Sequence, residues 1–326
     1  MPNKDKTIAP KASQTTEKEI KHVATLDLTG MKAEDLAKVE TISHVATLIV
    51  PESLMGVLAD VKLEHVASTI PVPDGKQVNV RNMNGPIQMG GDSLVSDDDC
   101  LQLLVVNGPL IFMTPVTESR DVQLVVNGPV FAPQGSENAL GAAIRQLNGP
   151  MDFYHTDGDI KVHSGQAKLN GAVLANANGS PEDILLIAGQ LLVNSQVESV
   201  GFKQIYIAGQ ALIPKEAEEL LSPYLQVFGQ IVWYSGTPRS FDGNESFNAA
   251  FFDYLPEPIT LILNGIIKFD ADITPELLKE KVTEIILNGI IEAPAHLVPL
   301  IQVLTTEKNG MINVADDESA DEDAEE

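Results

Sequence analysis

TEIILNGIIEA (Thr283–Ala293) decides the fold, because the chain repeats this pattern along most of its length. Apolar residues alternate with others into an Asn-Gly corner: Ile285 and Leu287 precede it, and Ile291 and Ala293 follow it. The copies recur at intervals of 18 to 24 residues, which predicts a solenoid made of strand, corner and strand. We place the corners of the other copies at Asn107, Asn127, Asn148, Asn170, Gly189, Gly209, Gly229 and Asn264, with weaker copies at Asn84 and Asn309.

Alternation with a period of two places the apolar side chains of each unit on one face, which a single unit cannot bury alone. Asn-Gly pairs are common in hairpins, but identical units in one register favour parallel stacking of like on like. Stacked Asn side chains can then form a hydrogen-bonded ladder. We expect this ladder to break where Ala188, Ala208 and Phe228 replace Asn.

The expected fold class is therefore a repeat solenoid of short parallel strands with Asn-Gly corners and a third side of mixed helix and loop. We divide the chain into a flexible N-terminal arm (1–19), strand and helix repeats (20–72), the Asn-Gly solenoid (73–314) and a disordered acidic tail (315–326). Thr274 and Pro275 are typical of an N-cap followed by the first helical residue, so a helix is expected at 275–282. Arg145 and Ala167 stand at inward positions, where the units should be imperfect or bulged.

Three histidines, His22, His44 and His65, occupy equal positions in copies of an HVA-S/T pattern. A packing or capping role near the start of each strand is the simpler interpretation, and a metal-binding ladder is the alternative. The run Asp97–Asp99 lacks the spacing of an EF-hand and is interpreted as a solvated turn rather than a calcium site. We expect no metal and no cofactor.

One interval is too long, because 36 residues separate Gly229 from Gly265. The excess, residues 235–250, has the composition of a loop and is predicted to be an insertion. Aromatic residues cluster around it, either as a recognition site or as anchors that hold the insertion to the solenoid. They are Trp233, Tyr234, Phe241, Phe247, Phe251, Phe252 and Tyr254.

A second candidate surface consists of apolar residues at positions that point outward from the first strand of each unit. They are Val105, Val125, Leu186, Tyr206, Ile262 and Ile286. An exposed apolar row indicates a partner surface, although helices of the chain itself or another subunit could cover it. Self-association is the interpretation we favour.

The formal net charge is −25, of which the tail contributes −8, so the rest of the chain carries −17. Nucleic acid and anionic membranes are therefore poor partners, and a protein partner or a second copy of the chain is favoured. A single cysteine, Cys100, excludes an internal disulfide and suits a reducing compartment. Without an apolar signal segment or a run long enough to cross a membrane, we expect a cytoplasmic protein.

No common motif of an enzyme is present, neither a P-loop nor HExxH nor a G-x-S-x-G elbow. The nearest polar cluster in the sequence contains Asp152, His155, Asp157 and Asp159. We name no catalytic residue and expect a protein without enzymatic activity.

The unit around Leu261-Ile262-Leu263-Asn264 resembles the leucine-rich repeat, in which LxxLxLxxN builds a strand and an Asn ladder. The Asn stands two places earlier here. The strand–Gly–strand units also look like the bactofilin-type β-helix, a polymer-forming scaffold. The first resemblance implies an α/β solenoid, the second a right-handed β-helix, and both imply binding or assembly.

The function expected is thus a non-catalytic repeat scaffold that mediates protein–protein interaction or self-assembly. A carbohydrate or small-ligand platform at the aromatic insertion is the alternative. A polysaccharide-active β-helix enzyme is the third possibility.

Overall fold

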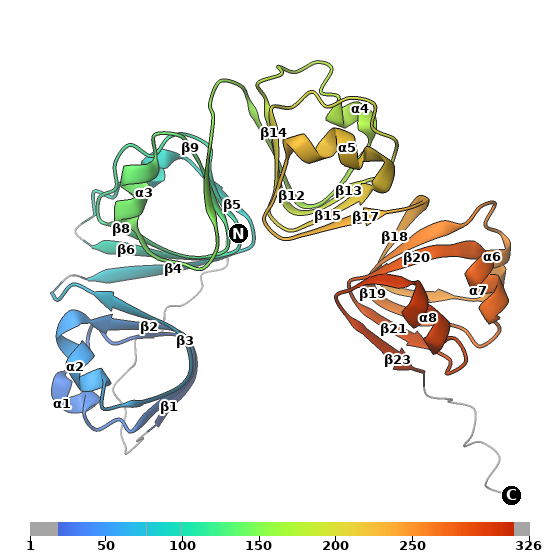
Figure 1. The fold of residues 1–326 in the computed structure, drawn as a ribbon. Helices are drawn as coiled ribbons and strands as arrows, with labels where there is room; N and C mark the ends of the chain where they lie inside the picture. Colours follow the sequence, from blue (N-terminus) through green and yellow to red (C-terminus); the bar gives the residue numbers. More distant parts are fainter. Residues whose placement is uncertain (1–18, 76, 99, 316–326) are drawn as a thin grey trace, which may run out of the picture. The chain divides into compact units, whose positions relative to one another are not determined.

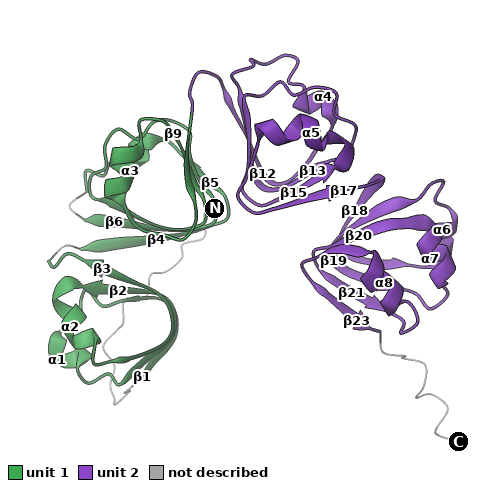
Figure 2. Cartoon of the chain, in the orientation of Figure 1, with its two compact units in different colours: residues 1–154 green, residues 155–326 purple. Residues whose placement is uncertain are grey.

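The computed structural model describes residues 19–315 except 76 and 99, and it divides into two compact units, residues 1–154 and 155–326 (Figure 2). Every strand pair among the described residues is parallel, and the strands form curled sheets with short helices along one side (Figure 1). We call each set of strands that lie on one another a stack, and each pass of the chain through it a layer. The expected arm and acidic tail lie outside the described residues, apart from Glu19 and Ala315.

Unit 1 begins with stack A, a sheet of three long strands in the order β1-β2-β3. Its elements are β1 (Glu19–Asp27), α1 (Ala33–Leu36), β2 (Thr41–Pro51), η1 (Glu52–Leu54), α2 (Met55–Leu58) and β3 (Lys62–Val72). Val23, Val45 and Val66 lie in register on successive strands. Leu36, Leu54 and Leu58 come from the helical side and close the core. Residues 20–72 therefore alternate strand and short helix, as the sequence predicts.

Stack B completes unit 1 with two four-stranded sheets, β10-β8-β6-β4 and β11-β9-β7-β5, one on each side of the corners. Its elements are β4 (Val78–Asn84), β5 (Ile87–Met89), η2 (Gly91–Leu94), β6 (Leu101–Asn107), β7 (Leu110–Phe112), β8 (Val122–Asn127), β9 (Val130–Pro133), α3 (Glu137–Ala143), β10 (Ile144–Leu147) and β11 (Met151–Tyr154). The register of β10 on β8 shifts between Ile144 and Gln146, which confirms the expected irregularity at Arg145.

Unit 2 begins with stack C, which has four layers. Its elements are β12 (Ile160–Leu169), α4 (Gly171–Leu174), β13 (Ile184–Val193), β14 (Gln204–Ile207), β15 (Gln210–Pro214), η3 (Lys215–Ala217), α5 (Glu218–Leu221), η4 (Ser222–Tyr224), β16 (Leu225–Val227) and β17 (Gln230–Tyr234). The first corner is Gly165, which pairs with Gly189. The predicted corner at Asn170 is wrong, because the Asn170 side chain accepts from the backbone N–H of Val173 and caps α4.

Stack D also has four layers. Its elements are β18 (Thr237–Phe247), α6 (Ala249–Asp253), β19 (Ile259–Phe269), α7 (Pro275–Lys281), β20 (Val282–Leu287), β21 (Ile290–Ala293), α8 (Val298–Leu304), β22 (Thr305–Lys308) and β23 (Met311–Val314). The predicted insertion at 235–250 is wrong, because β18 pairs along its whole length with β19 and Gly243 lies on Gly265. The predicted helix is confirmed as α7, and the Thr274 side chain accepts from the N–H of Leu277.

The apolar side chains of the alternating pattern fill the interior of each stack, as predicted. In stack B, Leu104, Val106, Leu124 and Val126 belong to one buried cluster. In stack D, Ile285 and Leu287 are fully buried with their counterparts from the layer below. Each stack thus has its own core, and no layer could form that core alone.

Glycine is required at the corners because the layers touch there. A Cβ atom on Gly128 would lie 2.4 Å from the carbonyl oxygen of Gly108, and one on Gly209 would lie 2.1 Å from that of Gly189. Such distances are far inside van der Waals contact, so a side chain would force the layers apart. Stack A uses a different corner, since His22, His44 and His65 adopt positive φ angles of 58°, 55° and 53°.

We expect Gly128→Ala to destabilise the protein by about 3 kcal/mol, because the new methyl group cannot fit without a shift of the backbone. Gly141→Ala in α3 of the same stack is the matched control, since a Cβ there meets nothing within 4 Å. Replacing a helical glycine by alanine should stabilise by about 0.5–1 kcal/mol. Urea unfolding measures both, and equal stabilities for the two variants would contradict the close contact.

Candidate interaction surfaces

The predicted Asn ladder is present in stack B. The side-chain Nδ2 of Asn107 donates to Oδ1 of Asn84 at 2.9 Å, Asn127 donates to Asn107 at 2.8 Å, and Asn148 donates to Asn127 at 2.7 Å. These bonds join neighbouring layers on the solvent side of the corner. They use the amide groups that a parallel stack places one above another.

In stack C the Asn ladder is absent where Ala188, Ala208 and Phe228 replace Asn, as expected, and a ladder of Gln side chains forms instead at the residue after each corner glycine. Gln166 donates to Gln190 at 2.8 Å, Gln190 to Gln210 at 2.7 Å and Gln210 to Gln230 at 3.1 Å. The recurring Gly-Gln pair is the sequence signal that could have predicted this. The longer side chain of Gln reaches the next layer from the opposite side of the glycine.

Stack D carries a ladder of Asp242, Asn264, Asn288 and Asn309, and it is bonded sideways to the Gln ladder of stack C. Gln210 donates to Oδ1 of Asn288 at 3.1 Å, and Asn288 donates back to Oε1 of Gln210 at 2.9 Å. In the last layer Asn309 donates to Gln230 at 2.6 Å. The two ladders therefore form one amide network that joins the stacks layer by layer.

We expect Gln210→Ala and Asn288→Ala to be coupled by about 1 kcal/mol, because each amide donates to the other. A double-mutant cycle on urea unfolding measures this coupling. Gln166→Ala with Asn309→Ala is the matched control pair, since these residues lie in the first and last layers of the network and should be additive. Additive behaviour of Gln210 and Asn288 would contradict the sideways bonds.

The histidines of stack A form a ring ladder at the corners. The ring centroids of His22 and His44 are 4.8 Å apart, as are those of His44 and His65. All three side chains are exposed. Among the described residues no group of three or more His, Cys, Asp or Glu could hold a metal ion. The equal spacing of the histidines thus has a structural explanation, namely that each forms the left-handed corner of one layer.

The outward apolar rows are buried, which corrects the expectation that they are exposed. Val105 and Val125 of stack B pack with Ile49, Ile70 and Val72 of stack A. At the edges of this interface Thr25 accepts from Asn82 at 3.1 Å, and Ser68 donates to Gln146 at 2.8 Å. The interface is therefore apolar in the middle and polar at both ends.

Stacks C and D pack in the same manner. Ile262 and Ile286, three residues before their corner glycines, pack against Leu192, Leu212 and Val232, which follow their corner glycines by three residues. Leu186 and Tyr206 are also buried, and the Tyr206 ring stacks on Phe228 with the centroids 6.4 Å apart.

The outward side chains on the other side of stack D, which does not face stack C, are polar. Three residues after the corner they are Ser246, Lys268, Glu292 and Asn313, and Lys268 pairs with Glu292 at 3.3 Å. A fifth stack would find no apolar face there to cover. Sideways packing in unit 2 therefore ends at stack D on this side.

Four of the aromatic residues around β18 belong to the core of stack D, as expected of anchors rather than of a recognition site. Phe247 and Phe252 are buried and contact Phe269, with ring centroids 5.6 Å and 6.2 Å away. Phe241 and Phe251 pack against the same cluster.

The remaining three aromatic residues behave differently from one another. Trp233 packs on the core of stack C. The hydroxyl of buried Tyr234 donates to the carbonyl oxygen of Val193, two layers away. Tyr254 alone of the seven is strongly exposed, at 86%.

A polar cluster holds the helical side of stack C together. Asp183 is 2% exposed, and its carboxylate accepts from Asn176, from the backbone N–H groups of Ser180 and Asp159, and from Lys161 at 3.0 Å. The hydrogen bonds from Asn176 and Lys161 hold the pKa of this carboxyl well below its usual range. Asp159, part of the cluster singled out in the sequence, thus serves the structure through its backbone.

We expect Asp183→Asn to lower stability at neutral pH, and the difference from the wild type to shrink as the pH falls. A carboxyl whose pKa is lowered on folding stabilises the fold above its ordinary pKa of about 3.9, and this contribution is lost as the pH falls further. Urea unfolding over a pH series measures both proteins. A difference that stays constant down to the acid transition would contradict the electrostatic origin.

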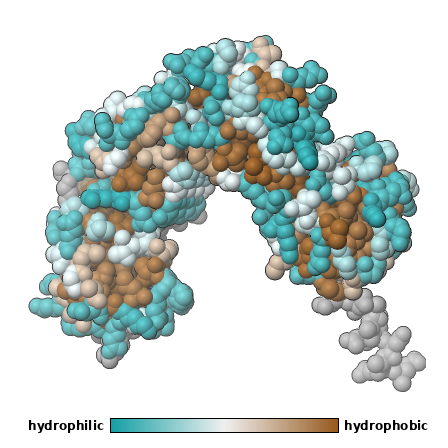
Figure 3. Space-filling model, viewed as in Figure 1, coloured by the Kyte–Doolittle hydropathy of each residue, from teal (hydrophilic) through white to brown (hydrophobic). Residues whose placement is uncertain are grey.

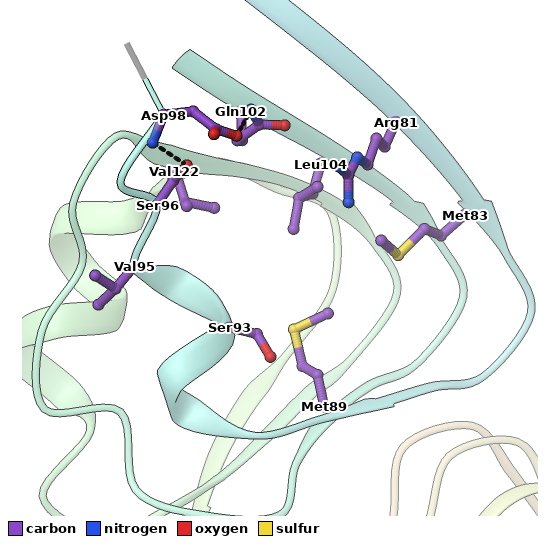
Figure 4. Close-up of a pocket in the computed structure, with 10 residues that line it drawn as sticks. All are labelled: Arg81, Met83, Met89, Ser93, Val95, Ser96, Asp98, Gln102, Leu104 and Val122. Carbon is purple, nitrogen blue, oxygen red and sulfur yellow. Dashed lines mark hydrogen bonds between the residues drawn. The ribbon is translucent and has the colours of Figure 1, made fainter. Parts of the chain in front are cut away.

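A cavity of about 300 Å³ opens at the first layer of stack B (Figure 4). Arg81 and Met83 come from β4, whereas Gln102 and Leu104 come from β6, so the lining is mixed. Gln102 Nε2 donates to Asp98 at 3.2 Å and to Cys100 Sγ at 3.0 Å, and Asn79 donates to the Gln102 carbonyl. The polar groups of Gln102 are thus satisfied within the protein, and the cavity is an open end of the stack.

The outermost strands are the surfaces that remain. Within the described residues, the first and last layers of each stack pair on one side only. These strands are β1 and β3 in stack A, β4, β5, β10 and β11 in stack B, β12, β16 and β17 in stack C, and β18, β22 and β23 in stack D. Because each of these strands has a neighbouring strand on one side only, its other edge is a natural site for adding a further strand.

Comparison with known proteins adds no identification. No protein-family model, no curated protein and no solved structure matches this chain. None of the described helices is long and apolar enough to pass through a bilayer.

Proposed function

We propose that the chain is a non-catalytic solenoid scaffold that assembles with itself or with a protein partner through the open ends of its stacks. The proposal is carried by the difference between the sides of the stacks and the strands at their ends. The apolar rows on the sides that join the stacks are covered inside each unit, whereas the end strands have a neighbouring strand on one side only. Side rows that are already covered, together with end strands that lack one neighbour, favour association along the stacking direction.

The in-register pairing of equivalent residues supports the solenoid part of the proposal. Asn107 pairs with Asn84 and with Asn127, and Gly189 pairs with Gly165. Each layer has a strand on both sides of its corner, which fits the bactofilin-type β-helix better than the single strand of a leucine-rich repeat. We carry over from that resemblance only the expectation of assembly.

The carbohydrate or small-ligand platform at residues 235–250 loses its basis. Phe241, Phe247, Phe251 and Phe252 are occupied with one another and with Phe269 in the core. Sugars bind to exposed aromatic faces, and the described part of this region offers chiefly Tyr254. Assembly therefore remains the function that we favour.

Static light scattering over a concentration series tests the proposal. We expect a weight-average mass above that of one chain (35.0 kDa) that rises with concentration. Free edge strands bind through main-chain hydrogen bonds, so the association should persist at salt concentrations that screen the net charge of −25. A strict monomer at every concentration would rule out self-assembly.

A further inference from the structure

The two ends of unit 2 differ in how well their edge strands are protected. The first-layer edge consists of β12 and β18, which carry Lys161, His163 and Lys168, and Pro238, Arg239, Asp242 and Glu245, respectively. Charged residues and proline are the usual means by which proteins prevent a further strand from adding to an edge. The first-layer end is therefore closed to another sheet.

The last-layer edge lacks this protection. Strands β16, β17 and β23 read LQV, QIVWY and MINV, without a charge or a proline. Only β22 has charges, Glu307 and Lys308, and Glu307 accepts a hydrogen bond from Gln230 of stack C.

Exposed apolar side chains gather at the same end. Val303 of α8 is 79% exposed, Met311 and Val314 of β23 are 56% and 58% exposed, and Ile231 of β17 is 36% exposed. Figure 3 shows apolar residues (brown) at the centre of this end of stack D, inside a hydrophilic rim (teal). An apolar core that reaches the surface beside unpaired strands is typical of a surface meant to be covered.

The backbone of this end is also directed outward. The N–H of Gln230 donates to Gly209 and that of Met311 donates to Gly289, so both point back into the sheet. Because N–H groups alternate in direction along a strand, those of Ile231 and Ile312 point away from the stack. Both stacks therefore offer donors to a strand placed on their last layer.

A partner that binds this end must match the last-layer edges of stacks C and D at the same time. The hydrogen bond of 2.6 Å from Asn309 to Gln230 fixes the last layers of stacks C and D side by side. A partner that covers the last layers of both stacks needs two edge strands that are as far apart as β17 and β23. It also needs an apolar surface to cover the exposed apolar side chains of this end. A second copy of unit 2 has such a surface in its own last layer.

We propose that two copies of this chain associate through the last layers of unit 2, with β17 and β23 of one copy facing those of the other. The contact is two-fold symmetric, because the first-layer end is blocked by its charges and Pro238. A two-fold contact closes on itself, so this contact gives a dimer and not a fibre. This inference rests on the proposed self-assembly and specifies its surface and its stoichiometry.

Sedimentation velocity over a concentration series, with the full chain, tests the contact. The double variant Met311→Lys/Val314→Lys should raise the dissociation constant of the dimer on the order of 100-fold, because two lysines cannot be buried without a partner. Ile231→Lys on stack C is an independent variant with the same expectation. The matched control is Val173→Lys in the first layer, where an exposed valine (44%) lies at the opposite end and the dimer should be unaffected.

Circular dichroism and thermal unfolding show whether each variant folds. If the double variant does not fold, the Ile231→Lys variant tests the contact instead. Loss of the dimer in the last-layer variants alone supports the inference. If the last-layer lysine variants assemble as strongly as the wild type, or if the wild type grows into open fibres, the last-layer contact is overturned while self-assembly stands. A wild type that stays monomeric overturns both.

Discussion

The contact between corner glycines is the constraint on which stacks B, C and D depend. The carbonyl oxygen of Gly108 lies where a side chain of Gly128 would begin, so the two layers meet at the distance of two backbones. This close approach holds the strands on both sides of the corner in register, which in turn aligns the Asn and Gln side chains into ladders. Stack A reaches the same result with histidines in a left-handed conformation, whose rings stack where the other corners have amides.

Both units are assembled by one rule. The outward side chains of the strands that follow the corners of the first stack pack against those of the strands that precede the corners of the second stack. The middle of this contact is apolar. Thr25 and Ser68 in unit 1 and the Gln ladder in unit 2 give this contact its polar partners. The apolar residues of each row would be unfavourable in water, so a stack of either unit is completed by its neighbour.

The interior of the fold could be predicted from the sequence, because alternation and glycine corners act locally. The first layers of stacks C and D are not predicted by the apolar pattern, since their corner glycines, Gly165 and Gly243, stand among polar residues such as Ser164 and Asp242. An outermost layer has one neighbour and faces water on the other side, so the apolar pattern weakens there. The sideways bonds could not be predicted either, because Gln210 and Asn288 are 78 residues apart and meet only through the placement of two stacks.

The amide network of unit 2 has an electrostatic consequence. Each Gln of stack C donates to the layer that follows, whereas each Asn of stack D donates to the layer that precedes. A row of aligned amides carries a dipole, as the peptide groups of a helix do. Here two such rows run in opposite senses side by side, so their dipoles cancel. A layer added to one row alone would add a dipole that the other row does not oppose.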